Sequence, residues 1–234
     1  MLSLKRMVKA NYQWLAHLIG RMSGRYYVED YVRVYPEQIA FSRLGRRRQA
    51  RDDEVRNYLN HCKFYRFASQ FVPGKSVVDV GCGSGYGCAL LANSGSREVY
   101  GCDISRQALR FAKQRYGTIA QFSEQGITDL RLYADSAFDV TISSEVLEHI
   151  KEYGLAGRAV EELKRITATG GIVVVGTPNS ELLGDHGFFY DEIRNLFSAK
   201  FKSFVVFENA LVSLSDQTGN VGKGGSPQGI RASW

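Results

Sequence analysis

The chain has 234 residues, enough for one domain with an elaboration and for a full hydrophobic core. No stretch approaches the roughly 20 apolar residues of a membrane span, and the basic N-terminus lacks the apolar core of a secretory signal. The four cysteines have no metal-ligand spacing and are typical of small buried residues in a reducing compartment, so we expect a cytoplasmic protein.

The net charge of +6 is concentrated at the N-terminus, where residues 1–75 hold 15 Lys+Arg and 6 Asp+Glu. Apolar residues recur there at helical spacing from Leu4 to Met22, with most basic residues elsewhere on the wheel. Such a helix can contact an anionic membrane, bind nucleic acid or pack on its own domain. The arginine-rich residues 43–51 fit either a solvated loop or an RNA contact. We expect residues 1–70 to form a helical cap that shapes the substrate region.

A predicted helix over residues 53–71 leads to the stretch around which the rest is organised. Residues 77–80 hold three valines, as in a strand buried on both faces, and run directly into glycines at 81, 83, 85 and 87. Glycine permits positive φ and lets a ligand approach the main chain, and the following helix, predicted over residues 88–92, presents free N–H groups. The spacing fits a dinucleotide fingerprint poorly, because the sixth position from Gly81 is Tyr86.

About twenty residues further on, Asp103 ends a second apolar strand. An acid there can accept hydrogen bonds from both hydroxyls of a ribose or cap the next helix. The later elements follow in order: a helix over 107–116, a strand over 119–122, a strand with its loop and short helix over 138–150, a helix over 155–166, a turn, strand and exit loop over 170–179, an irregular loop over 180–189, a helix over 190–201, a sixth strand over 204–207 and a glycine-rich, flexible tail over 216–234.

The motif Asp79, Gly81, Gly83, Gly85, followed by Asp103 and by the fourth and fifth strands, resembles the class I S-adenosylmethionine-dependent methyltransferases over residues 67–207. The resemblance implies a Rossmann-like α/β fold, a doubly wound and mainly parallel sheet, in a methyltransferase domain over residues 71–215. It also implies S-adenosyl-L-methionine as the cofactor. The cofactor-binding residues that it implies are Asp79, Gly81, Cys82, Gly83, Gly85, Asp103, Ile104, Gln125, Ile127, Ser144 and Glu145.

The chain departs from the family after the third strand. Many members carry an Asp there that contacts the adenine amino group, and the matching position in this chain is Gly126. We therefore expect the adenine edge to be read by main chain near Ile127, by Gln125 or by Glu124.

Methyl transfer to a hydroxyl requires a base that removes the proton. His149 follows Glu148 after the fourth strand, and His186 lies beside Asp185 after the fifth, so these two histidines are the candidate catalytic residues. His17 and His61 lie on predicted helices and are expected to be structural. Glu145 and Glu148 are not accompanied by an aspartate-rich constellation, so we expect a metal-independent reaction.

The acceptor is the least constrained part of the prediction. The two-proline motif that marks methylation of base amines is missing after the fourth strand, which favours O-methylation of a small molecule such as a sugar, polyketide or quinone. Alternatives are N-methylation of a small molecule, RNA methylation, or a non-catalytic cofactor-binding partner subunit. Nucleic acid is not the expected partner. A peripheral membrane contact through the N-terminal helix and an oligomer stay open.

Overall fold

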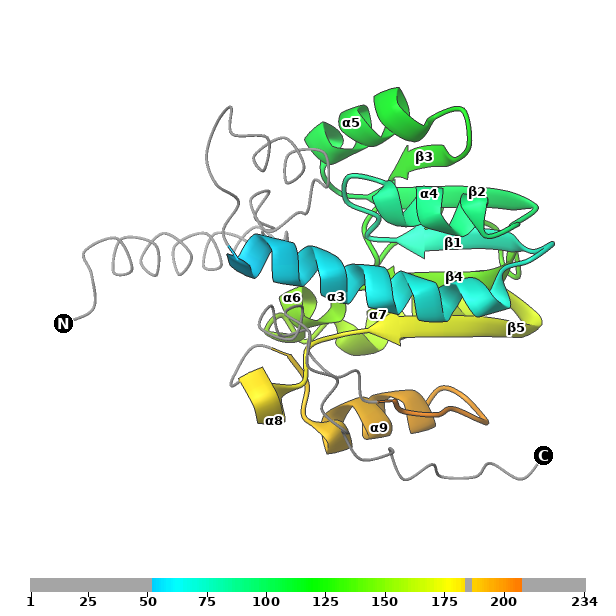
Figure 1. Cartoon of the computed structure of the whole chain (residues 1–234). Coiled ribbons are helices and arrows are strands. Elements are labelled where there is room, and N and C mark those ends of the chain that lie inside the picture. Colours follow the sequence, from blue (N-terminus) through cyan, green and yellow to red (C-terminus); the bar gives the residue numbers. More distant parts are fainter. Residues whose placement is uncertain (1–51, 184–186, 208–234) are drawn as a thin grey trace.

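The computed structural model describes residues 52–183 and 187–207. Their strands form one sheet in the order β3-β2-β1-β4-β5, and every neighbouring pair is parallel (Figure 1). The predicted doubly wound α/β fold is confirmed. The strands are β1 (Ser76–Val80), β2 (Glu98–Asp103), β3 (Gln121–Glu124), β4 (Phe138–Ser144) and β5 (Thr167–Gly176).

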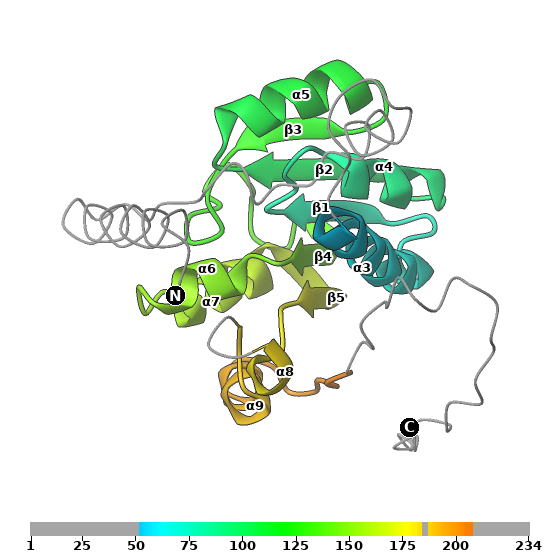
Figure 2. The ribbon, with the colours of Figure 1, turned by 60° about the vertical axis from the view of Figure 1, so that its left-hand side comes forward.

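Helices cover both faces of this sheet, with α3 and α4 on one side and α6 and α7 on the other (Figure 2). The turn between α3 and β1 is a short 3-10 helix over Ser69–Phe71. The helices are α3 (Asp52–Ala68), α4 (Tyr86–Asn93), α5 (Arg106–Tyr116), α6 (Leu147–Lys151), α7 (Ala156–Ile166), α8 (Ser180–Leu183) and α9 (Tyr190–Ser198).

Strand β1 lies between β2 and β4, and all five of its residues are buried. Its side chains alternate between two hydrophobic cores, because successive residues of a strand point to opposite faces. Val77 belongs to the core under α3 and α4, whereas Val78 and Val80 belong to the core under α6 and α7. By the same alternation Asp79 faces α3 and α4.

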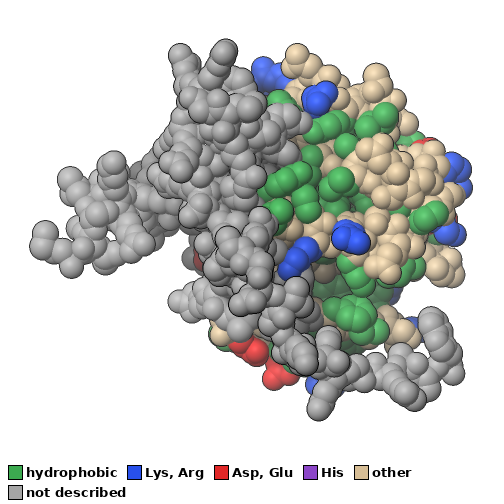
Figure 3. Space-filling view, viewed as in Figure 1, with side chains coloured by type: hydrophobic (Ala, Val, Ile, Leu, Met, Phe, Trp, Pro, Cys, Tyr) green, Lys and Arg blue, Asp and Glu red, His purple; other side chains and the backbone are tan. Residues whose placement is uncertain are grey.

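Helix α7 shows why the second core forms. Ala159, Val160, Leu163 and Ile166 recur at helical spacing and are fully buried. They pack with β1 residues and with the short helix α6. The opposite side of the molecule, which carries α3 and α4, shows hydrophobic side chains at its surface among polar and basic ones (Figure 3). The sheet is therefore a middle layer between two helical layers.

From β1 the chain first adds β2 and β3 on one side of β1, and then crosses over to add β4 and β5 on the other side. The point of crossover lies between β1 and β4. Open α/β sheets bind ligands at this switch point, outside the carboxyl ends of the strands. The loop after β1 and the loop after β4 meet there. The fold thus brings the glycine-rich loop beside the residues that follow β4.

Two sequence-based expectations about elements were wrong. Residues 204–207 form no strand and run as irregular chain, with Val205 and Phe207 67% and 69% exposed. A strand needs a hydrogen-bonded partner as well as an apolar pattern, and the sheet of the described residues ends at β5. The loop predicted over 180–189 also begins with the single turn α8.

Several predictions concern residues outside the described ranges. These are the amphipathic N-terminal helix, the arginine-rich residues 43–51, His17, His186 and the tail over 216–234. Helix α3 belongs to the predicted cap and packs against α4 and β4. No helix among the described residues has both the length and the apolar character that crossing a membrane requires.

Candidate functional site

The loop between β1 and α4 follows a backbone path that favours glycine. Gly81, Gly83 and Gly85 have φ of 82°, 53° and 84°, in the left-handed region that side chains disfavour. A Cβ added at Gly81 would lie 2.3 Å from Cγ2 of Val146, and one at Gly85 would lie 2.8 Å from Cβ of Ala112. The loop therefore passes too close to the chain after β4 and to α5 for a larger residue.

Backbone hydrogen bonds fix the same loop to the end of β2. The N–H groups of Gly81 and Cys82 both donate to the carbonyl oxygen of Cys102, at 2.8 Å and 2.9 Å. Cys82 is buried and also lines the cavity described below. Gly85 is the N-cap of α4 and offers no side-chain acceptor to the N–H groups of its first turn, which have no partner within the helix itself.

Asp103 supports the loop from the other side. The residue is 5% exposed, its Oδ2 accepts from the N–H of Gly83 at 2.9 Å, and its Oδ1 accepts from the N–H of Ser105 at 2.8 Å. Ser105 rather than Asp103 caps α5, because its Oγ accepts from the N–H of Ala108. Asp103 also lines the cavity. This arrangement suits the two hydroxyls of a ribose.

The polar side chains predicted to read adenine are engaged elsewhere. Gln125 lines the cavity, but its Oε1 accepts from the N–H of Leu132 at 2.9 Å and its Nε2 donates to Oγ of Ser123 at 3.1 Å. Glu124 pairs with Arg106 at 2.9 Å on the exposed surface. The main chain on either side of Ile127 is partly engaged too, because the carbonyl oxygen of Gly126 accepts from the N–H of Asp129 and that of Thr128 accepts from Nε of Arg158, both at 2.9 Å.

Ile104 and Ile127 both line the cavity. Ile127 is 3% exposed and belongs to the core under α6 and α7. These two side chains give the cavity an apolar surface next to Asp103. A flat heteroaromatic ring attached to a ribose would find an apolar contact there.

Asp79 lies behind the loop and not among the residues that line the cavity. Its side chain is fully buried, its Oδ2 accepts from the hydroxyl of Tyr65 at 2.9 Å, and its Oδ1 has no hydrogen-bond partner among the described residues. Burial raises the pKa of Asp79 to about 7, because desolvation disfavours the ionised form. The direct cofactor contact expected of Asp79 stays a prediction, and what the structure shows is a link between β1 and α3.

Helix α3 contributes side chains that sequence reasoning missed. His61 and Tyr65 of α3 line the cavity together with Tyr86 of α4, and Nδ1 of His61 is hydrogen-bonded to the hydroxyl of Tyr86. Burial lowers the pKa of His61 to about 4, so its imidazole is neutral at pH 7. The spacing of four between His61 and Tyr65 puts them on one helix face, and that was the available signal.

The chain after β4 places two carboxylates and an imidazole at the same cavity. Glu145 has a φ of 54°, and its N–H donates to the carbonyl oxygen of Gly176 at 2.9 Å. Glu148 is 5% exposed and its Oε2 accepts from the hydroxyl of Thr177 at 3.1 Å. Its Oε1 lies 3.7 Å from Nε2 of His149. The structure thus brings His149 to the cavity, while His186 lies outside the described residues.

The two carboxylates influence each other. Burial raises the pKa of Glu145 to about 7. Burial also raises the pKa of Glu148 well above its ordinary value, and the negative charge of Glu145 adds to that shift. The buried Ser144 completes this part of the lining. No cluster of three or more His, Cys, Asp or Glu side chains arranged for a metal ion occurs in the described part of the chain.

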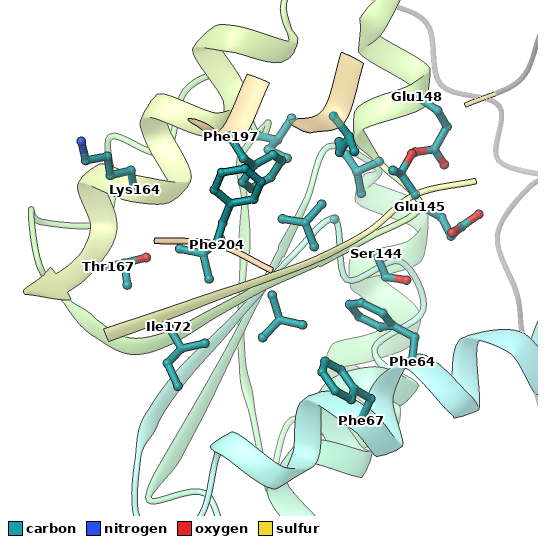
Figure 4. Close-up of a pocket in the computed structure, with 18 of the residues that line it drawn as sticks. Phe64, Phe67, Ser144, Glu145, Glu148, Lys164, Thr167, Ile172, Phe197 and Phe204 are labelled. Carbon is teal, nitrogen blue, oxygen red and sulfur yellow. The ribbon is translucent and has the colours of Figure 1, made fainter. Parts of the chain in front are cut away.

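These groups, apart from Asp79, Glu124 and Gly85, line one open cavity of about 1950 Å³ (Figure 4). Phe64 and Phe67 of α3 face it from one side, Phe197 and Phe204 from the other, and it continues along β5 past Ile172. Strand β5 runs between these two pairs of phenylalanines (Figure 4), so the cavity extends along both sides of the strand and is larger than a common ligand pocket of about 300–1,000 Å³. The open glycine loop and the acceptor oxygens of Asp103 fit an adenosyl group.

Comparisons with known proteins agree with this geometry. Residues 78–175 match the family model described as a methyltransferase domain. A Mycolicibacterium smegmatis protein named as a probable S-adenosylmethionine-dependent methyltransferase is 29% identical over 122 residues, covering 52% of this chain and 45% of the relative. A ubiquinone biosynthesis O-methyltransferase of Ralstonia nicotianae is 37% identical over 93 residues, covering 38% of this chain and 39% of the relative. The chain thus spans less than half the length of these relatives.

Solved structures share the fold. The [4+2]-cyclase SpnF has a TM-score of 0.50 at 22% identity, covering 58% of this chain and 56% of that protein. A chain from the complex of the Haloferax volcanii Trm112 methyltransferase activator has a TM-score of 0.53 at 23% identity, covering 60% of this chain and 66% of its own. Residues 78–175 therefore carry a methyltransferase domain, and the similarity to proteins named as probable S-adenosylmethionine-dependent methyltransferases supports a class I enzyme whose cofactor is S-adenosyl-L-methionine.

Proposed function

We propose that this chain transfers the methyl group of S-adenosylmethionine to a small-molecule acceptor. One observation carries the proposal: a single cavity has the glycine loop and Asp103 in one part of its lining and Glu145, Glu148 and His149 in another. The cavity therefore offers a place for the donor and titratable groups for an acceptor. The fold alone does not decide the reaction, since a neighbour of the same fold is named a [4+2]-cyclase.

The chain's own residues would hold the donor. The main chain of residues 81–85 and the carboxylate of Asp103 would bind the nucleoside, and Ile104 and Ile127 would give its base an apolar contact. When bound, S-adenosylmethionine supplies an electrophilic methyl group on a sulfonium that leaves as a neutral thioether. The remaining requirement is a group that accepts the acceptor's proton.

His149 is the proposed base among the described residues. Its Nε2 would take the proton of an acceptor hydroxyl, and the Glu148 carboxylate, with Oε1 3.7 Å away, would stabilise the resulting imidazolium. His186 remains the second candidate. If both histidines are dispensable, the acceptor atom is already nucleophilic, as in an unprotonated amine.

We favour O-methylation of a ring-bearing metabolite. Relatives named as ubiquinone biosynthesis O-methyltransferases support an oxygen acceptor, and the phenylalanines of the cavity wall suit a ring. N-methylation, RNA methylation and a non-catalytic role are the alternatives. RNA methylation predicts affinity for bulk RNA that falls steeply with salt and that depends on the arginines at 46–48. We expect no such binding at 50 mM salt.

Calorimetry with S-adenosylhomocysteine tests the donor site. We expect binding to the wild type, at least tenfold weaker binding to Asp103→Ala, or about 1.4 kcal/mol, and unchanged binding to Asp191→Ala. Asp191 is an exposed residue outside the cavity lining, so it controls for loss of a surface charge. Tight NADH binding without binding of S-adenosylhomocysteine would overturn the assignment.

The acceptor is found by incubating the protein with labelled donor and metabolite extracts and identifying the labelled product by mass spectrometry. Label transferred to a small molecule supports the proposal. Label recovered only in RNA, or none in any extract, contradicts it.

A further inference from the structure

Two carboxylates line the cavity, and no Lys or Arg of the described ranges forms an ion pair with either of them. Glu145 and Glu148 face it from the chain after β4 (Figure 4). In the part of the chain that the structure describes, neither forms an ion pair with a Lys or Arg, and the group that approaches Glu148 is the imidazole of His149. Carboxylates withdrawn from water without such partners are costly; Glu148 is buried and Glu145 half-buried, so their position at a cavity points to a ligand.

One carboxylate oxygen has an unmet hydrogen-bonding need. The side chain of Glu148 is 1% exposed, and its Oε1 has no hydrogen-bond partner among the described residues. Its Oε2 already accepts from Thr177. Buried acceptors in folded proteins are nearly always paired, and a donor that enters from the cavity would satisfy Oε1.

Glu145 is held in a conformation that its residue type disfavours. Its φ of 54° lies in the left-handed region, where glycine or asparagine would be less strained. The hydrogen bond from its N–H to Gly176 fixes that conformation. Such strain is concentrated at functional sites, so a carboxylate in this position indicates that the carboxylate itself is needed.

We propose that Glu145 and Glu148 form a subsite that binds a protonated amine carried by the acceptor. The proposal rests on the proposed function, because it places the acceptor in the cavity that also takes the donor. An ammonium group has three donors and no acceptor, and it can bond to both carboxylates, including Oε1 of Glu148. The methylated atom can be a different group of the same molecule.

The charge of the pair favours a single monovalent cation. Burial raises the pKa of both carboxyls, that of Glu145 to about 7, and the negative charge of Glu145 adds to the shift of Glu148. Near neutral pH the two therefore carry less than two negative charges and titrate as a unit. The titratable groups beside them are His149 and Tyr86, and neither supplies a permanent positive charge.

A matched set of small probes tests the subsite: benzylamine, which is cationic at pH 7.5, and its neutral analogue benzyl alcohol. Ligand-observed NMR titration of the full chain saturated with S-adenosylhomocysteine gives both dissociation constants. We expect benzylamine to bind at least tenfold more tightly. In the single variant Glu148→Gln and in the double variant with Glu145→Gln, the two dissociation constants should agree within about threefold. The control is Glu152→Gln, at an exposed residue outside the cavity lining; this variant should still prefer benzylamine.

Four results would overturn the proposal. The first is equal affinity of the wild type for benzylamine and benzyl alcohol. The second is a preference for benzylamine that survives the double substitution. The third is a preference for benzylamine that EDTA removes and Mg²⁺ restores, which would indicate a metal site. The fourth is a double variant that loses S-adenosylmethionine but keeps S-adenosylhomocysteine, which would make the sulfonium the bound cation. Failure of S-adenosylhomocysteine to bind the wild type refutes the proposed function instead, so the two failures are distinguishable.

Discussion

Replacing Asp79 with Asn should change how the stability of the protein depends on pH. The carboxyl of Asp79 has a pKa of about 7 in the folded chain against 3.8 ordinarily, because it is fully buried. Because the pKa of Asp79 is higher in the folded state, the fold gains stability from the protonated carboxyl. This stabilisation is complete at pH values below 3.8 and is lost as the pH rises through 7. Each pKa unit corresponds to about 1.4 kcal/mol. Between pH 5 and pH 8 the wild type should therefore lose about 3 kcal/mol through this residue.

Asn cannot titrate, so the variant should lack this loss. Its amide introduces a donor that Asp79 does not have, but the cost of that donor is the same at every pH and cancels between pH values. Glu145 and Glu148 titrate in both proteins and cancel as well. The difference in unfolding free energy between variant and wild type should shift by about 3 kcal/mol in favour of the variant from pH 5 to pH 8.

The assay is urea unfolding at pH 5, 6, 7 and 8 without cofactor, analysed by linear extrapolation with an unchanged slope. Asp191→Asn is the matched control, because Asp191 is exposed, and its difference from the wild type should stay constant. If the Asp79→Asn difference is the same at all four pH values within about 0.5 kcal/mol, the buried carboxyl is ionised throughout and the reasoning is refuted.

Three further outcomes are expected. Glu145→Gly should raise the thermal midpoint at pH 8. Relief of left-handed strain by about 1–2 kcal/mol and loss of a half-buried charge should outweigh the flexibility of glycine; a lower midpoint contradicts this. Gly87→Ala should destabilise the fold by about 1–3 kcal/mol and weaken S-adenosylhomocysteine binding in calorimetry, because its Cβ would lie 2.1 Å from Cζ of Tyr65; unchanged urea unfolding refutes the clash. His149→Gln should lower turnover more than tenfold at unchanged donor affinity, and a change below about threefold, under 1 kcal/mol of barrier, removes it as the base.

The sequence predicted the sheet well because its strands carry local signals. The valines of β1 break into glycines whose φ values demand that residue type, and Asp103 closes β2 at the expected distance. Helix α7 was evident from its apolar spacing. These signals depend on residues near one another in the chain, so no tertiary information was needed.

The rest depends on contacts between distant residues. Residues 204–207 have the apolar composition of a strand but pair with nothing in the sheet, and composition cannot reveal that. The left-handed conformation of Glu145 has no sequence marker, because the residue type argues against it. The bond between Tyr65 and Asp79 joins two elements across the core, so the placement of Asp79 behind the loop was not predictable from its motif.

The glycine loop is held to β2 by two hydrogen bonds, from the N–H groups of Gly81 and Cys82 to the carbonyl oxygen of Cys102. These bonds affect the rate at which the cofactor binds. A loop that already has its final hydrogen bonds loses little conformational entropy when a ligand arrives. Association should then be a single exponential phase whose rate grows linearly with ligand concentration, without the plateau of a slow rearrangement. The residence time of the cofactor, and not the opening of this loop, would set its affinity.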